Sequence, residues 1–118
     1  MVERAVSFFR ARQGNCAQSV AHSWCEKMSA NCEEYEHLHA CGHGRAPDGT
    51  CGALYAAKLI AGPERAAQIE AAFAAASGGF TKCRDIRTHR AMSCVQCVST
   101  AARLLYEHRV CQEETVAK

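Results

Sequence analysis

Residues 49–79 read GTCGALYAAKLIAGPERAAQIEAAFAAASGG, and this stretch decides the fold class. Its apolar residues recur with helical spacing and do not alternate as those of a strand would. Gly62-Pro63 ends one helix and opens the next, because proline is accepted in the first turn of a helix. The second helix ends at Gly78-Gly79. The stretch therefore predicts two consecutive helices, after Thr50 to about residue 61 and over residues 63–76.

The rest of the chain has the same character, with helix periodicity and almost no strand alternation. Further helices are predicted over residues 2–12, after Asn15, briefly after Cys83, and from Cys94 to about Val110. We therefore expect an all-α fold, a small helical bundle that forms one cysteine-rich domain over residues 1–118. The helix after Asn15 has an i, i+4 series that predicts its apolar face: Cys16, Val20, Trp24 and Met28.

Large apolar side chains are scarce in this sequence. The chain has 118 residues, of which 48% are hydrophobic, but 9 of these are cysteines and 22 are alanines. Leu, Ile, Val and Phe together make up only 16% of the residues, while the net charge is +2. We expect something besides aliphatic burial to help hold the fold together, and the nine cysteines are the obvious candidate.

Charge and hydropathy exclude several functions. The 14 Lys and Arg and the 12 Asp and Glu are spread along the chain, so the sequence offers no basic stripe for nucleic acid. No apolar run approaches the roughly 20 residues of a membrane span, and the first residues lack a signal-peptide core. We expect a cytoplasmic protein whose thiols stay reduced, so its cysteines are better interpreted as metal ligands or redox groups than as a disulfide framework.

Four cysteines are predicted to lie at helix N-termini. Three of them follow residue types that cap helices, in the pairs Asn15-Cys16, Thr50-Cys51 and Ser93-Cys94. Gln18 and Gln96 complete the capping-box pattern at two of these starts, and Cys83 lies two residues after Thr81. Free N–H groups and the positive end of the helix dipole favour a thiolate over a thiol. If the four ends converge, they suit a cluster of thiolates around a metal centre.

The spacing of these cysteines argues against the commonest zinc motifs. Intervals of 35, 32 and 11 residues put them on four separate elements, whereas zinc ribbons and knuckles present two close cysteine pairs. Only Cys94-Val95-Gln96-Cys97 has that close form. Because Val98 and not histidine follows it, the motif is not a c-type haem attachment site. Cys97 competes with Cys94 for the fourth ligand position.

The contexts of the four cysteines resemble a known family. They read Asn15-Cys16-Ala17-Gln18-Ser19-Val20, Gly49-Thr50-Cys51-Gly52-Ala53-Leu54, Cys83-Arg84-Asp85-Ile86, and Cys94 followed by Val98. From about residue 13 to 106 the chain is similar to a family of small redox-active proteins with a C…GCAxxG…C…C pattern. The resemblance implies that Cys16, Cys51, Cys83 and Cys94 are metal or redox residues, because an iron–sulfur site has been proposed for a similar domain. The order Cys51-Gly52-Ala53 and the residue Ala56 depart from the pattern.

The other cysteines allow a second site. Cys25, Cys32 and Cys41 have His37, His39 or His43 nearby and together could bind a second soft metal. The alternative is that they are buried packing residues or form disulfides. Cys111 is expected to be a surface or interface thiol. His22 and His108 are expected to be solvated or helix-capping groups, and His89 is expected to be a contact residue; none of the three is expected to bind a metal.

These observations favour a small metal-binding redox protein over a substrate-converting enzyme, and they identify no catalytic residue. The leading hypothesis is an iron–sulfur cluster, [2Fe–2S], held for electron transfer. The alternatives are a zinc or copper thiolate site and a thiol–disulfide redox protein that uses Cys94 and Cys97. The redox partner is unknown. The alanine-rich helix over residues 63–76 would suit a homodimer.

Overall fold

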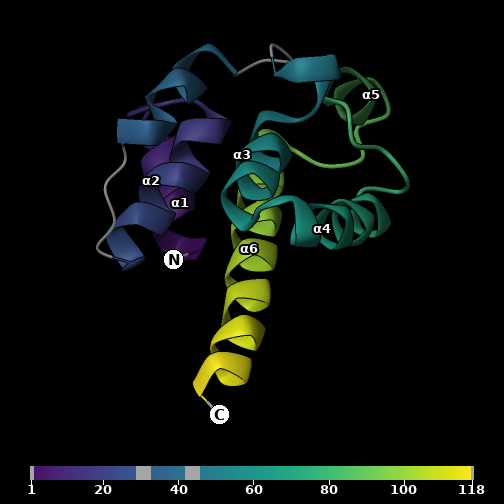
Figure 1. Ribbon diagram of the computed structural model, residues 1–118. Coiled ribbons are helices and arrows are strands. Elements are labelled where there is room, and N and C mark those ends of the chain that lie inside the picture. Colours follow the sequence, from purple (N-terminus) through teal and green to yellow (C-terminus); the bar gives the residue numbers. More distant parts are fainter. Residues whose placement is uncertain (1, 29–32, 42–45, 118) are drawn as a thin grey trace.

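The computed structural model describes residues 2–28, 33–41 and 46–117, which fold as an all-α domain, as predicted (Figure 1). Six α-helices occur in these parts: α1 (Val2–Arg10), α2 (Cys16–Met28), α3 (Gly52–Ala61), α4 (Pro63–Ala76), α5 (Cys83–Thr88) and α6 (Cys94–Ala117). Two 3₁₀ segments are η1 (Glu33–Ala40) and η2 (Pro47–Gly49).

Most of the predicted helix boundaries agree with the structure to within one or two residues, and those of α4 agree at both ends. One prediction was wrong. The last helix was expected to end near Val110, but α6 continues to Ala117 because no Gly or Pro interrupts it.

Three helices run side by side in the same direction, and their N-termini gather at one end of the molecule. These helices are α2, α3 and α6, which contact one another (Figure 1). We call this end the upper end, as drawn. Helix α1 packs against α2 and α6, and α4 packs against α3 and α6. The short helix α5 also lies at the upper end (Figure 1). The arrangement brings the predicted cysteine-bearing helix starts to one region of the molecule.

The core is built mainly from small side chains, because so few large ones are available. On α2, the predicted apolar face was only partly right: Val20 is buried, but Cys16, Trp24 and Met28 are only half-buried. The other buried residues of α2 lie on more than one face and are small: Ala17, Ser19, Ala21, Ser23 and Cys25. Small residues let helix backbones approach closely, so three helices can surround α2.

A few large apolar side chains anchor the remaining helices. Ile69 and Phe73 of α4 have no exposed surface, and neither has Leu54 of α3. Leu105 of α6 is 1% exposed. Burying side chains of this size contributes about 1.5–3 kcal/mol each. None of the helices in the described part of the chain has the length and apolarity that a membrane span requires.

Candidate functional site

The starts of α2 and α6 are each fixed by a pair of reciprocal hydrogen bonds. The N–H of Gln18 donates to Asn15 Oδ1 at 2.8 Å, and the N–H of Asn15 donates to Gln18 Oε1 at 2.9 Å. Ser93 and Gln96 form the same pair, at 3.1 and 2.8 Å. Both are capping boxes, as the sequence predicts. They make Cys16 and Cys94 the first residues of their helices.

Asn15 also ties the start of α2 to a distant part of the chain. Its side-chain amide Nδ2 donates to the carbonyl oxygens of Leu38 and His39, both at 3.0 Å. Leu38 has no exposed surface. One side chain therefore caps α2 and holds the end of η1 beside Cys16.

The start of α3 differs from the prediction in one respect. Thr50 was expected to cap this helix, but the residue at the N-cap is Cys51 itself. Thr50 instead forms an isolated antiparallel bridge with Lys82. The N–H of Cys51 donates to the carbonyl oxygen of Thr81 at 2.8 Å. Because Cys83 follows Lys82 directly, this backbone pairing holds Cys51 and Cys83 close to each other.

One cavity of about 40 Å³ collects the four cysteines that the sequence singles out, and a fifth with them. Its sulfur-bearing residues are Cys16, Cys51, Cys83, Cys94, Cys97 and Met92. The rest of the wall is Phe9, Asn15, Ile86 and Arg87. Space of this size exceeds the roughly 10–15 Å³ that a single water needs on a comparable scale. The fold therefore brings thiols from α2, α3, α5 and α6 to one enclosed space.

Gly52 allows the closest approach at this cavity. A Cβ atom placed on Gly52 would lie 2.7 Å from Cys16 Sγ and 2.6 Å from the carbonyl oxygen of Cys41. Carbon and sulfur do not approach that closely without a bond, so any side chain at this position would push Cys16 aside. The glycine that follows Cys51 therefore has a steric reason, since only a residue without a Cβ fits there.

Cys51 and Cys97 form a hydrogen-bonded pair that is only 4% and 5% exposed. The hydrogen bond from Cys97 lowers the pKa of Cys51 from 9.0 to about 7, against the effect of burial. The backbone N–H groups of Leu54 and Ala53 also favour the Cys51 thiolate. The same hydrogen bond raises the pKa of Cys97, because the proton that it donates is held in place. Cys51 therefore begins to ionise near neutral pH, and its thiolate form accepts the hydrogen bond from the Cys97 thiol.

Two other thiols of the cavity, Cys16 and Cys83, favour the protonated form. Burial, followed by repulsion from Cys51, raises the pKa of Cys16 to about 12, although the N–H of Ala53 acts in the opposite direction. Burial also raises the pKa of Cys83, and Arg87 partly counters it by its charge and a hydrogen bond. These thiols repel one another when ionised. A bound cation would remove that repulsion and favour all the thiolates together.

Cys94 is the only exposed cysteine among those that line the cavity. Cys16 and Cys83 are half-buried, while Cys51 and Cys97 are buried. The cavity is thus closed on the side of α3 and reaches the surface where α6 begins.

Cys25 and Cys41, two cysteines of the possible second site, do not line this cavity. Cys25 is buried and disulfide-bonded, so its sulfur is not a free thiol. Cys41 is a buried free thiol whose Sγ lies 4.0 Å from the carbonyl oxygen of His37. His37 and His39 are exposed. Cys32 and His43 lie outside the described residues, as does the side chain of Cys111.

Metal-binding side chains do not gather at one point in the described ranges 2–28, 33–41 and 46–117. Within these ranges, no three His, Cys, Asp or Glu side chains are placed so that they could hold one metal ion. The five cavity cysteines surround a common space without converging on a single point.

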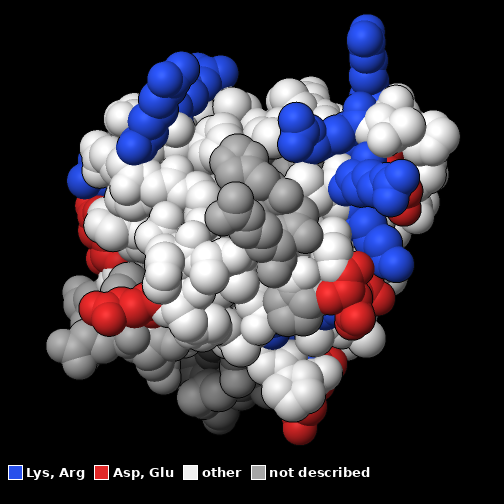
Figure 2. Space-filling view, turned by 90° about the horizontal axis from the view of Figure 1, so that it is seen from above, with Lys and Arg blue, Asp and Glu red and all other residues white. Residues whose placement is uncertain are grey.

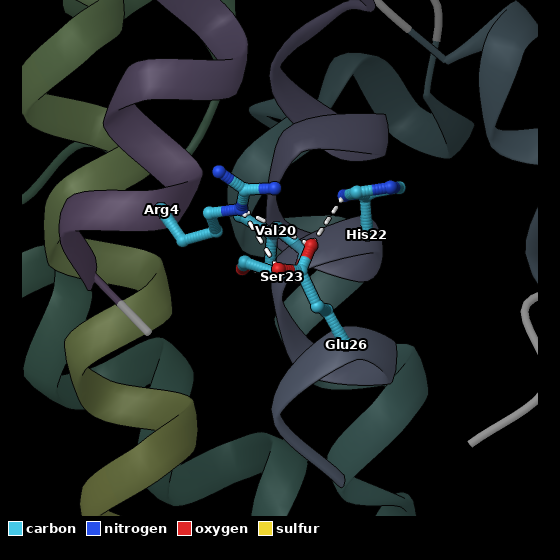
Figure 3. Close-up of polar contacts among 5 residues, drawn as sticks. All are labelled: Arg4, Val20, His22, Ser23 and Glu26. Atoms are coloured by element: carbon cyan, nitrogen blue, oxygen red, sulfur yellow. Dashed lines mark hydrogen bonds and ion pairs between the residues drawn. The ribbon is translucent and has the colours of Figure 1, made fainter. Parts of the chain in front are cut away.

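His89 makes a local contact, as expected, and His22, which was expected to be solvated or to cap a helix, makes local contacts too. The His22 ring stacks on Phe8 with 4.5 Å between centroids, and its Nδ1 lies 3.7 Å from Glu26 Oε2. Arg4 of α1 contacts the same carboxylate at 2.9 Å, so Glu26 lies between the two side chains (Figure 3). His89 stacks on Phe80 at 4.5 Å.

Two features of the cavity were missed or left open by sequence reasoning. Arg87 was not singled out, yet its position four residues after Cys83 on a helix places the two side chains together. Cys97 was expected to compete with Cys94, but both line the cavity because residues three apart share a helix face.

Comparison of the chain with protein-family models, with curated proteins and with solved structures finds no match. The resemblance to the cysteine-motif family therefore stays a prediction that rests on the contexts of four cysteines.

Proposed function

We propose that this protein holds an iron–sulfur cluster, [2Fe–2S], on Cys16, Cys51, Cys83 and Cys94 and serves in electron transfer. The observation that carries the proposal is the cavity of about 40 Å³ to which four separate elements contribute these cysteines. Four cysteine thiolates are the usual ligands of such a cluster. Each of its two irons takes two protein sulfurs, so the donors surround a space and do not meet at one point.

The surroundings of the cavity suit a negatively charged sulfur cluster. Backbone N–H groups of Ala53 and Leu54 donate to cavity sulfurs, and Arg87 donates to Cys83. Hydrogen bonds to the sulfurs, together with burial, set the reduction potential of iron–sulfur centres. The cluster would supply one-electron chemistry, while these residues orient the sulfurs and offset their charge. Exposed Cys94 marks the side where electrons would enter or leave.

The proposal includes a cytoplasmic location and a redox partner of unknown identity. The disulfide at Cys25 departs from the reduced thiols expected in that compartment. A zinc or copper thiolate site is the alternative metal assignment, because both ions also accept thiolate ligands. The two assignments differ in colour and in metal content.

A thiol–disulfide function is the second candidate, and the hydrogen bond between Cys51 and Cys97 favours it. The Cys51 thiolate would attack a substrate disulfide, form a mixed disulfide with one half of the substrate and release the other half as a thiol. Cys97 would then attack the sulfur of Cys51, form the Cys51–Cys97 disulfide and release the second half as a thiol. The two cysteines lose two electrons and two protons in total, and the substrate disulfide becomes two thiols. This candidate pairs Cys97 with Cys51, whereas the sequence alone suggests Cys94.

Anaerobic purification tests the proposal. We expect a brown protein with stoichiometric iron and sulfide, whose visible absorption is bleached by dithionite. Cys51→Ser should abolish iron loading, because serine is a poor ligand for this cluster, and Cys111→Ser should load as the parent does. Equal loading in both variants would contradict the assignment. Colourless protein with stoichiometric zinc or copper would establish the alternative metal site.

Cys97→Ser separates the two candidate functions. A cluster on the four proposed ligands should survive this change, whereas disulfide reduction should be lost. A variant that keeps disulfide reductase activity and loses the cluster would reverse both assignments.

A further inference from the structure

Six cations surround the upper end of the molecule without carboxylate partners. Elsewhere in the described part of the chain, Arg4, Lys58 and Arg103 form ion pairs with Glu26, Glu70 and Glu107, while Lys27 and Arg65 form none. The residues of the basic rim, as we call it, are all exposed: Arg10, Arg12, Lys82, Arg84, Arg87 and Arg90. None of the six forms an ion pair with another residue in the described part of the chain.

The basic rim lies beside the cysteine cavity in two groups. Arg87 lines the cavity itself. Arg10 and Arg12 line a neighbouring hollow that shares Phe9 and Asn15 with the cavity. Seen from above, Lys and Arg side chains stand along different sides of the upper face, with uncharged surface between them and some Asp and Glu side chains near its edges (Figure 2).

Two of these arginines occupy backbone positions that usually hold glycine. Arg12 and Arg90 have φ angles of 58° and 52°, in the left-handed region. Each follows the end of a helix, where the chain closes with the two hydrogen bonds of a Schellman motif. An arginine at such a position is strained relative to glycine. At both helix ends, a charged arginine therefore stands at a position where the backbone conformation favours glycine.

We propose that the basic rim docks the carboxylate-rich surface of a partner protein over the cysteine cavity. Complementary charge steers partners into register and raises association rates. The inference rests on the proposed function in one respect, since the partner would be the one that exchanges electrons with the centre beneath. Docking here would cover the exposed sulfur of Cys94, the shortest route into the cavity.

The placement of the charges favours a protein over other anions. The two groups of cations stand on different sides of the face, so one small anion cannot touch both. Nucleic acid would need a continuous basic track for its phosphates. Uncharged surface between two basic flanks instead suits a protein interface, which has an apolar centre and a polar edge.

The test uses poly-L-glutamate as an acidic polypeptide probe and the complete chain, both metal-loaded and metal-free. We expect binding at low salt that weakens at least about tenfold at physiological ionic strength. The double variant Arg12→Gly with Arg90→Gly should weaken binding about fivefold or more without lowering the melting temperature, because glycine suits both positions. Arg103→Gln, which removes a paired cation far from the rim, is the matched control and should bind as the parent does.

The place where the probe binds is determined from the rate at which Cys94 is alkylated in the metal-free protein. Bound poly-L-glutamate should slow this alkylation, and poly-L-lysine should not. Equal affinity of the double variant and the parent would overturn the inference. Tighter binding of duplex DNA than of poly-L-glutamate would assign the rim to nucleic acid instead. If the protein never loads iron, but the double variant still binds poly-L-glutamate more weakly than the parent does, the docking surface is supported and the proposed function is refuted.

Discussion

At the scale of single residues, the cavity depends on the absence of a side chain at Gly52. Its α-carbon lies between Cys16 Sγ and the Cys41 carbonyl oxygen, at distances that leave no space for a Cβ. The pattern of the family that the chain resembles has a glycine directly before the second cysteine. In this chain the glycine, Gly52, follows that cysteine, Cys51. The structure gives the physical reason for a glycine after Cys51, because Cys16 Sγ of α2 packs against the backbone of α3 at Gly52.

The first prediction concerns this contact. Gly52→Ala should lower the free energy of unfolding by about 1–3 kcal/mol, because an overpacked site must shift. It should also lower the iron content, because Cys16 moves away from the cavity. Urea denaturation and metal analysis measure the two effects.

The control is Gly49→Ala, where a Cβ meets nothing within 4 Å but φ is +71°. Left-handed strain should cost about 1–2 kcal/mol there, with unchanged iron content. Full iron content in Gly52→Ala would refute the role given to this glycine.

The second prediction concerns the Cys51 thiolate. Its pKa is lowered to about 7 in the folded state, so the stability it contributes is fully present above the unfolded value of about 9. That contribution is lost as the pH falls through about 7. Cys97→Ala removes the hydrogen-bond donor and should raise the pKa of Cys51, which moves this window to higher pH.

Ultraviolet absorption of the thiolate in reduced, metal-free protein measures the shift. Cys97→Ser keeps an O–H donor and should retain more of the lowered pKa than Cys97→Ala does. The step near pH 7 should disappear in Cys51→Ser. An unchanged step in Cys97→Ala would show that the hydrogen bond does not set this pKa.

At the scale of helices, the caps decide where the cysteines stand. Asn15 and Ser93 both complete capping boxes, but only Asn15 also donates to Leu38 and His39. We predict that Ser93→Ala costs about 1 kcal/mol of stability, the usual value of an N-cap. Asn15→Ala should cost more, because it also leaves two carbonyl groups without their donor. Denaturant unfolding of the two variants gives the order, and equal losses would contradict it.

Helix positions were predictable where local chemistry fixes them. Asn15, Ser93 and Gly62-Pro63 act within a few residues, so the sequence predicts the starts of α2, α4 and α6 correctly. The N-cap of α3 was missed because the bridge to Lys82 takes Thr50 away from that position. Such pairing joins residues far apart in sequence, and no local pattern reveals it.

At the scale of the whole molecule, a bound centre would join four elements. Cys16, Cys51, Cys83 and Cys94 lie on α2, α3, α5 and α6 or at their starts. Binding only to the folded state stabilises it by about 4 kcal/mol when the ligand is at a thousand times its dissociation constant. We predict that the loaded protein melts well above the metal-free protein under anaerobic calorimetry. The difference should vanish in Cys83→Ser and persist in Cys111→Ser, and equal melting temperatures for loaded and metal-free parent would contradict it.

The meeting of distant cysteines was predicted from their helix-start contexts, and the shared cavity agrees with that expectation. The basic rim was not predictable in the same way. Its cations come from residues 10–12 and 82–90, and along the chain they mix with acidic residues. Only the fold brings the end of α1 and helix α5 to the same face.

The shared direction of α2, α3 and α6 has an energetic consequence. Each helix start carries roughly half a positive charge, so three adjacent parallel starts repel one another. Antiparallel neighbours would cancel this repulsion, but here the negative charge must come from sulfur. A chain whose thiols are all protonated or alkylated would lack that compensation. The Cys51 thiolate at the start of α3 offsets part of this repulsion, whereas the protonated Cys16 at the start of α2 does not. Protonation of Cys51 would therefore weaken the packing of the three helices at this end.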